Sequence, residues 1–188
     1  MKKFVIGIAG GSASGKSTFS DNLEKALEPI PVKVFHMDSY FKKAEDRPRA
    51  TAPISGKIYM DDNHPTTIDL SKLEKDVKDY IENGDAQVVI IEGLLTLWYE
   101  EILKYLDLKL FVDCKADERI VRRIKRNMEW GLTYDQISNV YLDLVRFRHD
   151  EYVEPTKWRA DFILNGSNPS DTTLKMIVSY VVSSISKE

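Results

Sequence analysis

The stretch GGSASGKST, residues 10–18, constrains the fold of this chain more than any other feature of its sequence. It follows an apolar run at 4–9 and precedes a segment whose apolar residues recur at helical spacing until Pro29. Gly10, Gly15, Lys16 and Ser17 fit the pattern G-x-x-x-x-G-K-S/T between a strand and a helix, which is the setting of a P-loop. A plain turn is the alternative, but turns rarely match the pattern and both flanks. The sequence therefore predicts a phosphate-binding loop.

The order of residues in this loop suits phosphate binding. Glycines let backbone N–H groups turn toward phosphate oxygens, and the helix that follows adds the positive end of its dipole. Lys16 is expected to reach the β- and γ-phosphates, and the hydroxyl of Ser17 to bind Mg²⁺. The predicted nucleotide-binding residues of the loop are Gly10, Gly11, Ser12, Ala13, Ser14, Gly15, Lys16, Ser17 and Thr18.

Short apolar runs and helical patterns alternate along the rest of the chain. The runs predict strands at 4–9, 32–36, 88–91, 108–112 and 162–164. Two capping boxes, SKLE at 71–74 and TYDQ at 133–136, mark expected helix starts. Strands that are apolar throughout and alternate with helices indicate a parallel sheet covered on both sides. We therefore expect a three-layer α/β/α P-loop fold with a five-stranded parallel sheet.

Length and charge limit the class of protein. A chain of 188 residues, 43% hydrophobic, suits a single domain over residues 1–188 with its own core. The one cysteine, Cys114, cannot form an intrachain disulfide, which favours a reducing, cytoplasmic location. A net charge of −3 gives no support for a nucleic-acid surface. No apolar run approaches the roughly 20 residues of a membrane span. From the charge and from the apolar runs, respectively, neither nucleic acid nor a membrane is an expected partner.

Two carboxylates stand where predicted strands end. Asp38 follows the second strand, and Glu92 ends the third. Ligands of open parallel sheets sit beyond the carboxyl ends of the strands, so both are expected near Lys16 and Ser17. A carboxylate there can hold Mg²⁺, or it can accept the proton of an attacking hydroxyl. The alternatives are a helix cap or turn for Asp38 and a solvent-facing strand end for Glu92.

The segment DERIVRRIKRN, residues 117–127, carries an arginine stripe at helical spacing. Its members are Arg119, Arg122, Arg123 and Arg126, with apolar residues on the opposite side. Aligned like charges repel, so an anionic partner is the natural compensation. A surface stripe paired with acids from elsewhere is the alternative.

Residues 41–68 show no sustained period and include three prolines. Loops of this length in compact domains are usually functional or disordered, which favours a substrate-covering segment over an unstructured insertion. His64 is interpreted first as a turn residue before Pro65, with substrate contact as the alternative, and His149 as structural. Trp98, Trp130 and Trp158 are too scattered in the sequence to predict a base-stacking platform.

Together these residues resemble the uridine kinase and phosphoribulokinase group of P-loop kinases. The matching stretches, in family order, are GGSASGKST, MDSYFK, NHPTTID, IIEGLL, LFVDCKADERIVRRIKR and EPTKWRAD. The P-loop alone is generic, whereas DSYFK, the LFVD block with its arginines, and EPTK followed by AD make the resemblance specific.

The resemblance implies ATP-dependent, Mg²⁺-assisted phosphorylation of a hydroxyl on a small riboside, such as uridine or cytidine. It implies Asp38 as base, with Ser17, Glu92 and Asp38 around Mg²⁺, and a helical lid at 117–133 carrying Arg119, Arg122 and Arg123. Asn165 and Gly166 would lie near the adenine, and 41–68 would bind the small-molecule acceptor. The implied catalytic residues are Asp38, Lys16, Arg119 and Arg123. The implied acceptor contacts are Asp38, Tyr40, Asp62, Asn63, His64 and Arg119. A homo-oligomer is compatible with the sequence.

Three departures from the family pattern bear on the acceptor. Uridine kinases carry a long pyrimidine-covering insertion before the EG strand, where this chain has only LSKLEKDVKDYIENGDAQ. Their ribose-binding aspartate before HP is Asn63 here, with Asp61 and Asp62 adjacent. Where uridine kinases have an ERGRD-like lid segment, this chain has MEWGLT. Another riboside or small metabolite (nicotinamide riboside, pantothenate or a sugar) and a non-catalytic nucleotide-binding protein therefore remain as alternatives.

Overall fold

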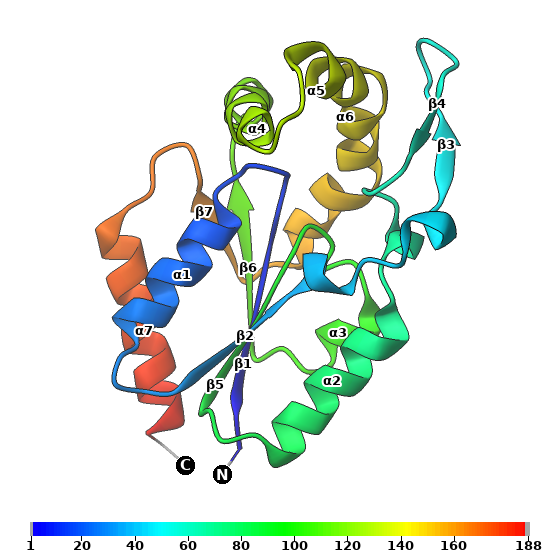
Figure 1. The fold of residues 1–188 in the computed structure, drawn as a ribbon. Helices are drawn as coiled ribbons and strands as arrows, with labels where there is room; N and C mark the ends of the chain where they lie inside the picture. The colour runs from blue at the N-terminus through cyan, green and yellow to red at the C-terminus, as the bar shows by residue number, and fades with distance from the viewer. Residues whose placement is uncertain (1, 187–188) are drawn as a thin grey trace.

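The computed structural model describes residues 2–186 and has a five-stranded parallel sheet at its centre (Figure 1). The strand order is β2-β5-β1-β6-β7, and each neighbouring pair is parallel. The strands are β1 (Phe4–Gly10), β2 (Val32–His36), β5 (Val88–Glu92), β6 (Leu108–Asp113) and β7 (Phe162–Asn165). All five predicted strands are confirmed, and no predicted end differs from the observed one by more than one residue.

Helices cover both faces of this sheet (Figure 1). The bounds are α1 (Lys16–Ala26) and α7 (Asp171–Ile185) on one face, and α2 (Leu70–Asn83) and α3 (Glu100–Leu103) on the other. Successive strand residues point to opposite faces, so Val5 packs in the core under α2 and α3 while Ile6 packs under α1 and α7. The predicted three-layer α/β/α fold is confirmed.

One of the two predicted capping boxes is wrong. Helix α2 is capped by Asp69, whose carboxylate accepts a hydrogen bond from the backbone N–H of Lys72 at 3.1 Å, so SKLE lies inside the helix. Asp is a better cap than Ser71 could be here, because it precedes the first apolar helical residue, Leu70. The other box is confirmed: Thr133 caps α5 (Tyr134–Val140) and exchanges hydrogen bonds with Gln136.

Three helices, α4 (Ala116–Glu129), α5 and α6 (Arg146–Arg148), lie beyond the carboxyl ends of the strands (Figure 1). Two π-helical turns, Tyr141–Val145 and His149–Val153, flank α6, and a 3-10 segment, Glu154–Arg159, leads into β7. This helical layer follows directly from β6, so its first helix starts beside the P-loop.

Residues 41–68 form an antiparallel hairpin between short 3-10 turns. Strand β3 (Arg49–Thr51) pairs with β4 (Ile58–Met60). The backbone N–H of Ser55, at the tip, donates to Asp143 Oδ1 at 3.0 Å in the helical layer. Each strand has only three residues, which is too short for a period-two pattern to appear in the sequence.

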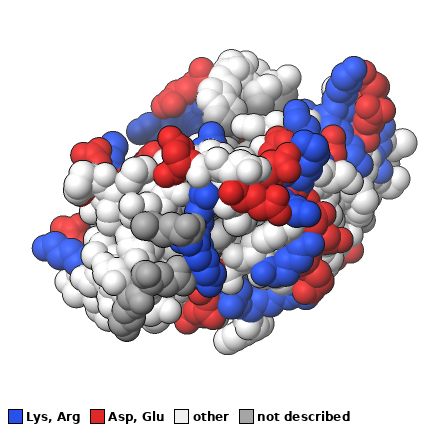
Figure 2. Space-filling model, turned by 90° about the horizontal axis from the view of Figure 1, so that it is seen from below, with Lys and Arg blue, Asp and Glu red and all other residues white. Residues whose placement is uncertain are grey.

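The end of the molecule opposite the helical layer carries an ordinary charged surface. Figure 2 shows lysine and arginine side chains interspersed there with aspartate and glutamate. Within residues 2–186, no helix has the length and apolar character needed to cross a membrane.

Candidate active site

The P-loop joins β1 to α1 and has an unusual backbone. Gly10 and Gly15 have φ angles of +151° and +101°. Ala13 has φ +62°, and among the described residues it is the one non-glycine residue with a positive φ. A non-glycine residue held in this region costs on the order of 1–3 kcal/mol. Left-handed residues set among right-handed ones can turn neighbouring N–H groups to one side and form an anion-binding concavity.

Two of the three residues predicted to hold Mg²⁺, Ser17 and Glu92, lie side by side. The Ser17 hydroxyl, at the start of α1, is 3.3 Å from each carboxylate oxygen of Glu92, at the end of β5. Glu92 is buried, and His36 Nδ1 contacts its Oε1 at 2.9 Å. A hydroxyl and a carboxylate are hard oxygen donors, and Mg²⁺ in kinases binds through one or two such groups plus phosphates and water. The residues present therefore fit the ion.

A cleft of about 390 Å³ opens beside Lys16, and we call it the Lys16–Asp38 cleft. Lys16 and Ser12 reach it from the P-loop, and Asp38 from the turn after β2. Asp62 and Asn63 line it from the end of the hairpin segment, and Arg123 and Arg126 from α4. Seven residues that the sequence analysis singles out thus line one concave site: Ser12, Lys16, Asp38, Asp62, Asn63, Arg123 and Arg126.

The arginine stripe faces the P-loop rather than solvent. Arg123 donates to Ser12 Oγ at 2.7 Å, and Arg126 approaches the same atom at 3.4 Å. Burial, and then the neighbouring Arg126 charge, lower the pKa of Arg123. The Nε of Arg123 is buried and has no hydrogen-bond partner within residues 2–186. Two crowded, desolvated guanidinium groups at the mouth of an anion-binding loop are best satisfied by a phosphoryl group.

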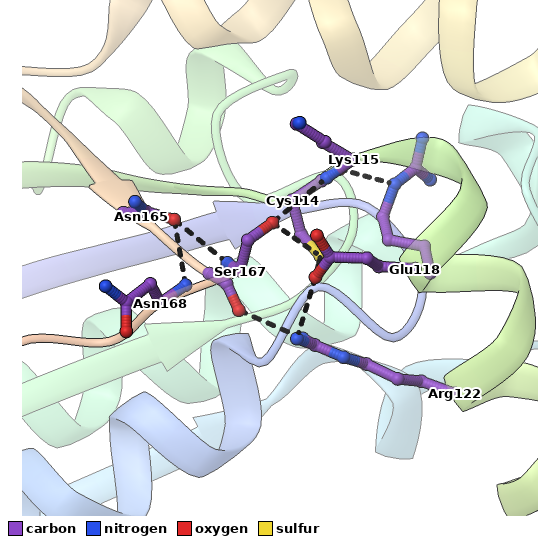
Figure 3. A network of polar contacts seen from close by, with 9 residues as sticks. Cys114, Lys115, Glu118, Arg122, Asn165, Ser167 and Asn168 are labelled. Atoms are coloured by element: carbon purple, nitrogen blue, oxygen red, sulfur yellow. Dashed lines mark hydrogen bonds and ion pairs between the residues drawn. The ribbon is translucent and has the colours of Figure 1, made fainter.

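A second cavity of about 290 Å³, the Asn165 cavity, lies on the other side of the P-loop. It is lined by Gly15 and Thr18, by apolar side chains of α1, β7 and α7, and by Asn165, Gly166 and Arg122. Arg122 Nη1 donates to Gly166 O at 3.0 Å, and Nη2 of the same guanidinium group donates to Glu118 Oε2 at 3.2 Å (Figure 3). A largely apolar cavity beside a P-loop suits the base of a nucleotide.

The loop after β7, which bounds this cavity, is held by the side chain of Asn165, the last residue of that strand. Asn165 Oδ1 accepts hydrogen bonds from the backbone N–H groups of Ser167 and Asn168, both at 3.0 Å (Figure 3). Gly166 packs so closely on the P-loop that a Cβ there would lie 2.3 Å from Ser14 O. A side chain at this position would therefore push the two loops apart.

Arg119 and His149 lie behind the P-loop, outside the residues that line the Lys16–Asp38 cleft. A Cβ at Gly11 would be 2.6 Å from Arg119 Nη1 and 3.0 Å from His149 Cε1. Arg119 Nε donates to Cys114 O at 3.0 Å, and His149 Nε2 lies 3.3 Å from Glu154 Oε2. Both side chains are buried, so Arg119 supports the loop from behind in this conformation.

Two further residues predicted to contact the acceptor also lie elsewhere. The Tyr40 hydroxyl donates to Asp76 in α2 at 3.1 Å, and burial, followed by this contact, raises its pKa to about 12. His64 caps the 3-10 turn Pro65–Thr67, its Nδ1 accepting from the backbone N–H of Thr66 at 3.1 Å. Asp61 is not among the residues that line the cleft, and its buried carboxylate pairs with Arg148 at 2.6 Å.

Sequence reasoning missed two contributors to the site. His36 ends β2 and reads as a strand residue, so its contact with Glu92 depends on the β2–β5 register. Trp130 lines the Lys16–Asp38 cleft although it stands far in the sequence from the other cleft aromatic, Phe41. The one sequence signal for Trp130 is its spacing: it follows Arg126 by four residues, about one helical turn, and so continues the face of the arginine stripe.

The strand–P-loop–helix unit, the parallel sheet and the two cavities on either side of the loop define a P-loop kinase. The family model described as "Phosphoribulokinase / Uridine kinase family" matches residues 5–85 and 83–173. A uridine kinase of Staphylococcus aureus (strain JH9) is 31% identical over 208 residues, covering 98% of each chain. This protein belongs to the phosphoribulokinase / uridine kinase family.

Solved structures support the fold. A structure described as a possible uridine kinase from Bacillus stearothermophilus has a TM-score of 0.60 and 19% identity, covering 87% of this chain and 89% of the other. A proposed fructose transport system kinase from Silicibacter sp. TM1040 has a TM-score of 0.66 and 17% identity, covering 86% and 89%. At such identities the likeness concerns the fold alone.

The position of Arg123 leads to a prediction about catalysis. Arg123→Ala is expected to lower kcat about 10²- to 10³-fold while the KM for ATP changes much less, because charge on the transferring phosphoryl group develops toward the transition state. Steady-state kinetics of the variant will measure the split. Lys125→Ala, an exposed cation on the same helix, is the matched control. Wild-type kcat in Arg123→Ala would instead assign the stripe a structural role.

His149 leads to a prediction about pH. Burial, and then the Arg119 charge, lower the pKa of His149 from its ordinary value of 6.5. Its neutral form is therefore favoured by folding, and the stability that it contributes is present above about pH 6.5 and lost as the pH falls through the folded-state pKa.

Urea unfolding of wild type and His149→Gln between pH 8 and pH 5 measures this effect. The stability of wild type relative to the variant is expected to decrease as the pH falls, because glutamine does not titrate. A difference that stays constant across this range would show that His149 does not carry the acid sensitivity.

Proposed function

We propose that this protein is an ATP-dependent kinase that phosphorylates the primary hydroxyl of a riboside, with a nucleoside such as uridine or cytidine as acceptor. The observation that carries the proposal is the convergence of Lys16 and Asp38 on one cleft under Arg123 and Arg126. That cleft combines anion-binding groups with a carboxylate that can accept a proton. Family membership supports phosphotransfer in general.

The proposed roles follow from position. The P-loop and Lys16 bind the β- and γ-phosphates, with the base in the Asn165 cavity. Ser17 and Glu92, together with Asp38 from the cleft lining, would hold Mg²⁺, which neutralises charge on the phosphate oxygens when bound. Residues 41–68 form one side of the acceptor site, and residues 117–133 cover it as a lid.

In the transfer itself, the acceptor oxygen forms a bond to the γ-phosphorus as the bond from that phosphorus to the departing ADP oxygen breaks. Asp38 accepts the proton of the acceptor hydroxyl. Asp62 and Asn63 supply hydrogen bonds for sugar hydroxyls, which orients the nucleophile. Arg123 and Arg126 stabilise the charge that moves onto the phosphoryl oxygens.

A coupled ADP-release assay with purified protein and Mg-ATP tests this function. The acceptor panel contains uridine, cytidine, purine nucleosides, nicotinamide riboside, free ribose and other sugars, and pantothenate. The expected result is acceptor-dependent turnover highest with a riboside, with phosphate on its primary hydroxyl. A clear preference for pantothenate or a free sugar would overturn the riboside assignment. Tight ATP binding without turnover on any acceptor would favour a non-catalytic nucleotide-binding protein.

A further inference from the structure

Two aromatic rings line the Lys16–Asp38 cleft from distant parts of the chain. Phe41 follows the turn after β2, and Trp130 ends α4. Each ring carries a guanidinium group over one face: Arg47 Cζ lies 4.9 Å from the Phe41 centroid, and Arg126 Cζ lies 4.8 Å from the Trp130 centroid. Such cation–π contacts fix a ring and occupy only one of its faces.

The backbone holds Trp130 in place. Gly131 has φ +88°, a left-handed conformation that ends the helix, and the N–H of Leu132 returns to Asn127 O at 3.2 Å. Trp130 is nevertheless 68% exposed, and Leu132 is 43% exposed. A large flat ring that is fixed at a helix end and remains mostly exposed at the edge of a polar cleft has area available for a ligand.

We propose that Trp130 stacks on the heterocyclic base of the acceptor and that this base is a neutral ring. The proposal rests on the riboside kinase function proposed above and makes Trp130 a specificity-determining residue of that reaction. The ribose then lies toward Asp38, Asp62 and Asn63, and the base lies toward the apolar side of the cleft.

The charges around the rings select a neutral base. Lys16, Arg123 and Arg126 all line the cleft, and a guanidinium backs each aromatic ring. Of the two aspartates in the lining, Asp62 is already paired with Arg47 at 3.2 Å. A pyridinium ring stacked on Trp130 would place a second cation on an aromatic system that already faces Arg126. Uracil, cytosine and purines avoid this repulsion, whereas the nicotinamide of nicotinamide riboside does not.

The experiment compares Trp130→Ala, Trp130→Leu and Trp130→Phe, with Trp158→Ala as the matched control. Trp158 is 81% exposed and lies outside the cleft lining. With the best nucleoside of the wild-type panel, Trp130→Ala is expected to raise the acceptor KM about 5- to 150-fold, the usual range for losing one base–aromatic stack. Leucine is expected to behave like alanine, because it is apolar without a flat face, and phenylalanine to stay within about threefold of wild type.

A spectroscopic readout separates stacking from a general loss of structure. Acceptor binding is followed by tryptophan emission, with a non-hydrolysable ATP analogue present. The acceptor is expected to quench the emission of wild type and of Trp158→Ala. In Trp130→Phe, most of this quench is expected to disappear. The KM for ATP and the melting temperature are expected to stay at wild-type values in all four variants, because both tryptophans are exposed.

The outcomes distinguish this inference from the function on which it rests. A wild-type preference for a non-riboside overturns the proposed function and, with it, the stacking role. Riboside turnover with an unchanged acceptor KM in Trp130→Ala overturns the stacking role alone. A leucine variant as good as wild type would show simple apolar contact in place of stacking. A higher kcat/KM for nicotinamide riboside than for every neutral nucleoside would overturn the choice of a neutral ring.

Discussion

Lys16→Ala is expected to abolish phosphate transfer, with a fall in kcat/KM of about 10³-fold or more, and also to weaken nucleotide binding. Lys16 stands at the first position of α1, largely buried, and lines the cleft that also contains Asp38. Its charge neutralises the β- and γ-phosphates in the ground state and in the transition state, so both binding and turnover depend on it. Coupled ADP release measures turnover, and titration calorimetry with ATP measures affinity.

Lys25→Ala is the matched control for this variant. Lys25 lies in the last turn of the same helix and is exposed, so its loss removes one positive charge from α1 without touching the loop. Wild-type kinetics are expected for it. Normal turnover in Lys16→Ala would show that the glycine-rich loop is not the phosphate site, whatever its backbone conformation.

The sheet could be predicted from the sequence because its signal is local. Each strand is a short, mostly apolar run, and polar residues, Gly or Pro stand near its ends. Residues 88–91, for example, read as apolar without any knowledge of their neighbours β1 and β2. The error at α2 has the same origin: SKLE matches the capping-box pattern, but the helix is capped two residues earlier by Asp69, which leaves Leu70 inside the helix.

The hairpin could not be predicted because its stability is not local. Strands of three residues, β3 and β4, carry too little pattern, and the tip is held by Asp143, which lies 88 positions from Ser55. The energy that orders this segment therefore comes from contacts that the sequence does not reveal.

The candidate site divides in the same way. The P-loop is contiguous in the sequence, and the strand-end carboxylates follow from the general rule for parallel sheets, so the sequence predicts both. Helical spacing also predicted that four arginines share one side of α4. It could not show that they separate at the loop, with Arg122 at the Asn165 cavity, Arg123 and Arg126 at the Lys16–Asp38 cleft and Arg119 behind Gly11. That division depends on how α4 crosses the P-loop.

Asp38→Asn is the second variant for which a large effect is expected, and its effect differs in kind from that of Lys16→Ala. The amide has nearly the shape of the carboxylate but cannot take up the proton of the acceptor hydroxyl. Loss of a general base typically costs about 10²- to 10⁴-fold in rate, so kcat is expected to fall within that range. Nucleotide binding is expected to survive, with a moderate loss if Asp38 also contacts Mg²⁺.

Asp62→Asn provides the comparison within the same cleft. Asp62 pairs with Arg47 and is proposed to hold the sugar, so its variant is expected to raise the acceptor KM more than it lowers kcat. Together the two substitutions separate proton transfer from substrate orientation, because each removes one carboxylate charge from the cleft. The base role of Asp38 would be contradicted by the reverse pattern, in which calorimetry shows ATP binding lost in Asp38→Asn while the remaining turnover is normal. It would also be contradicted if both variants changed only the acceptor KM, since Asp38 would then orient the acceptor without taking its proton.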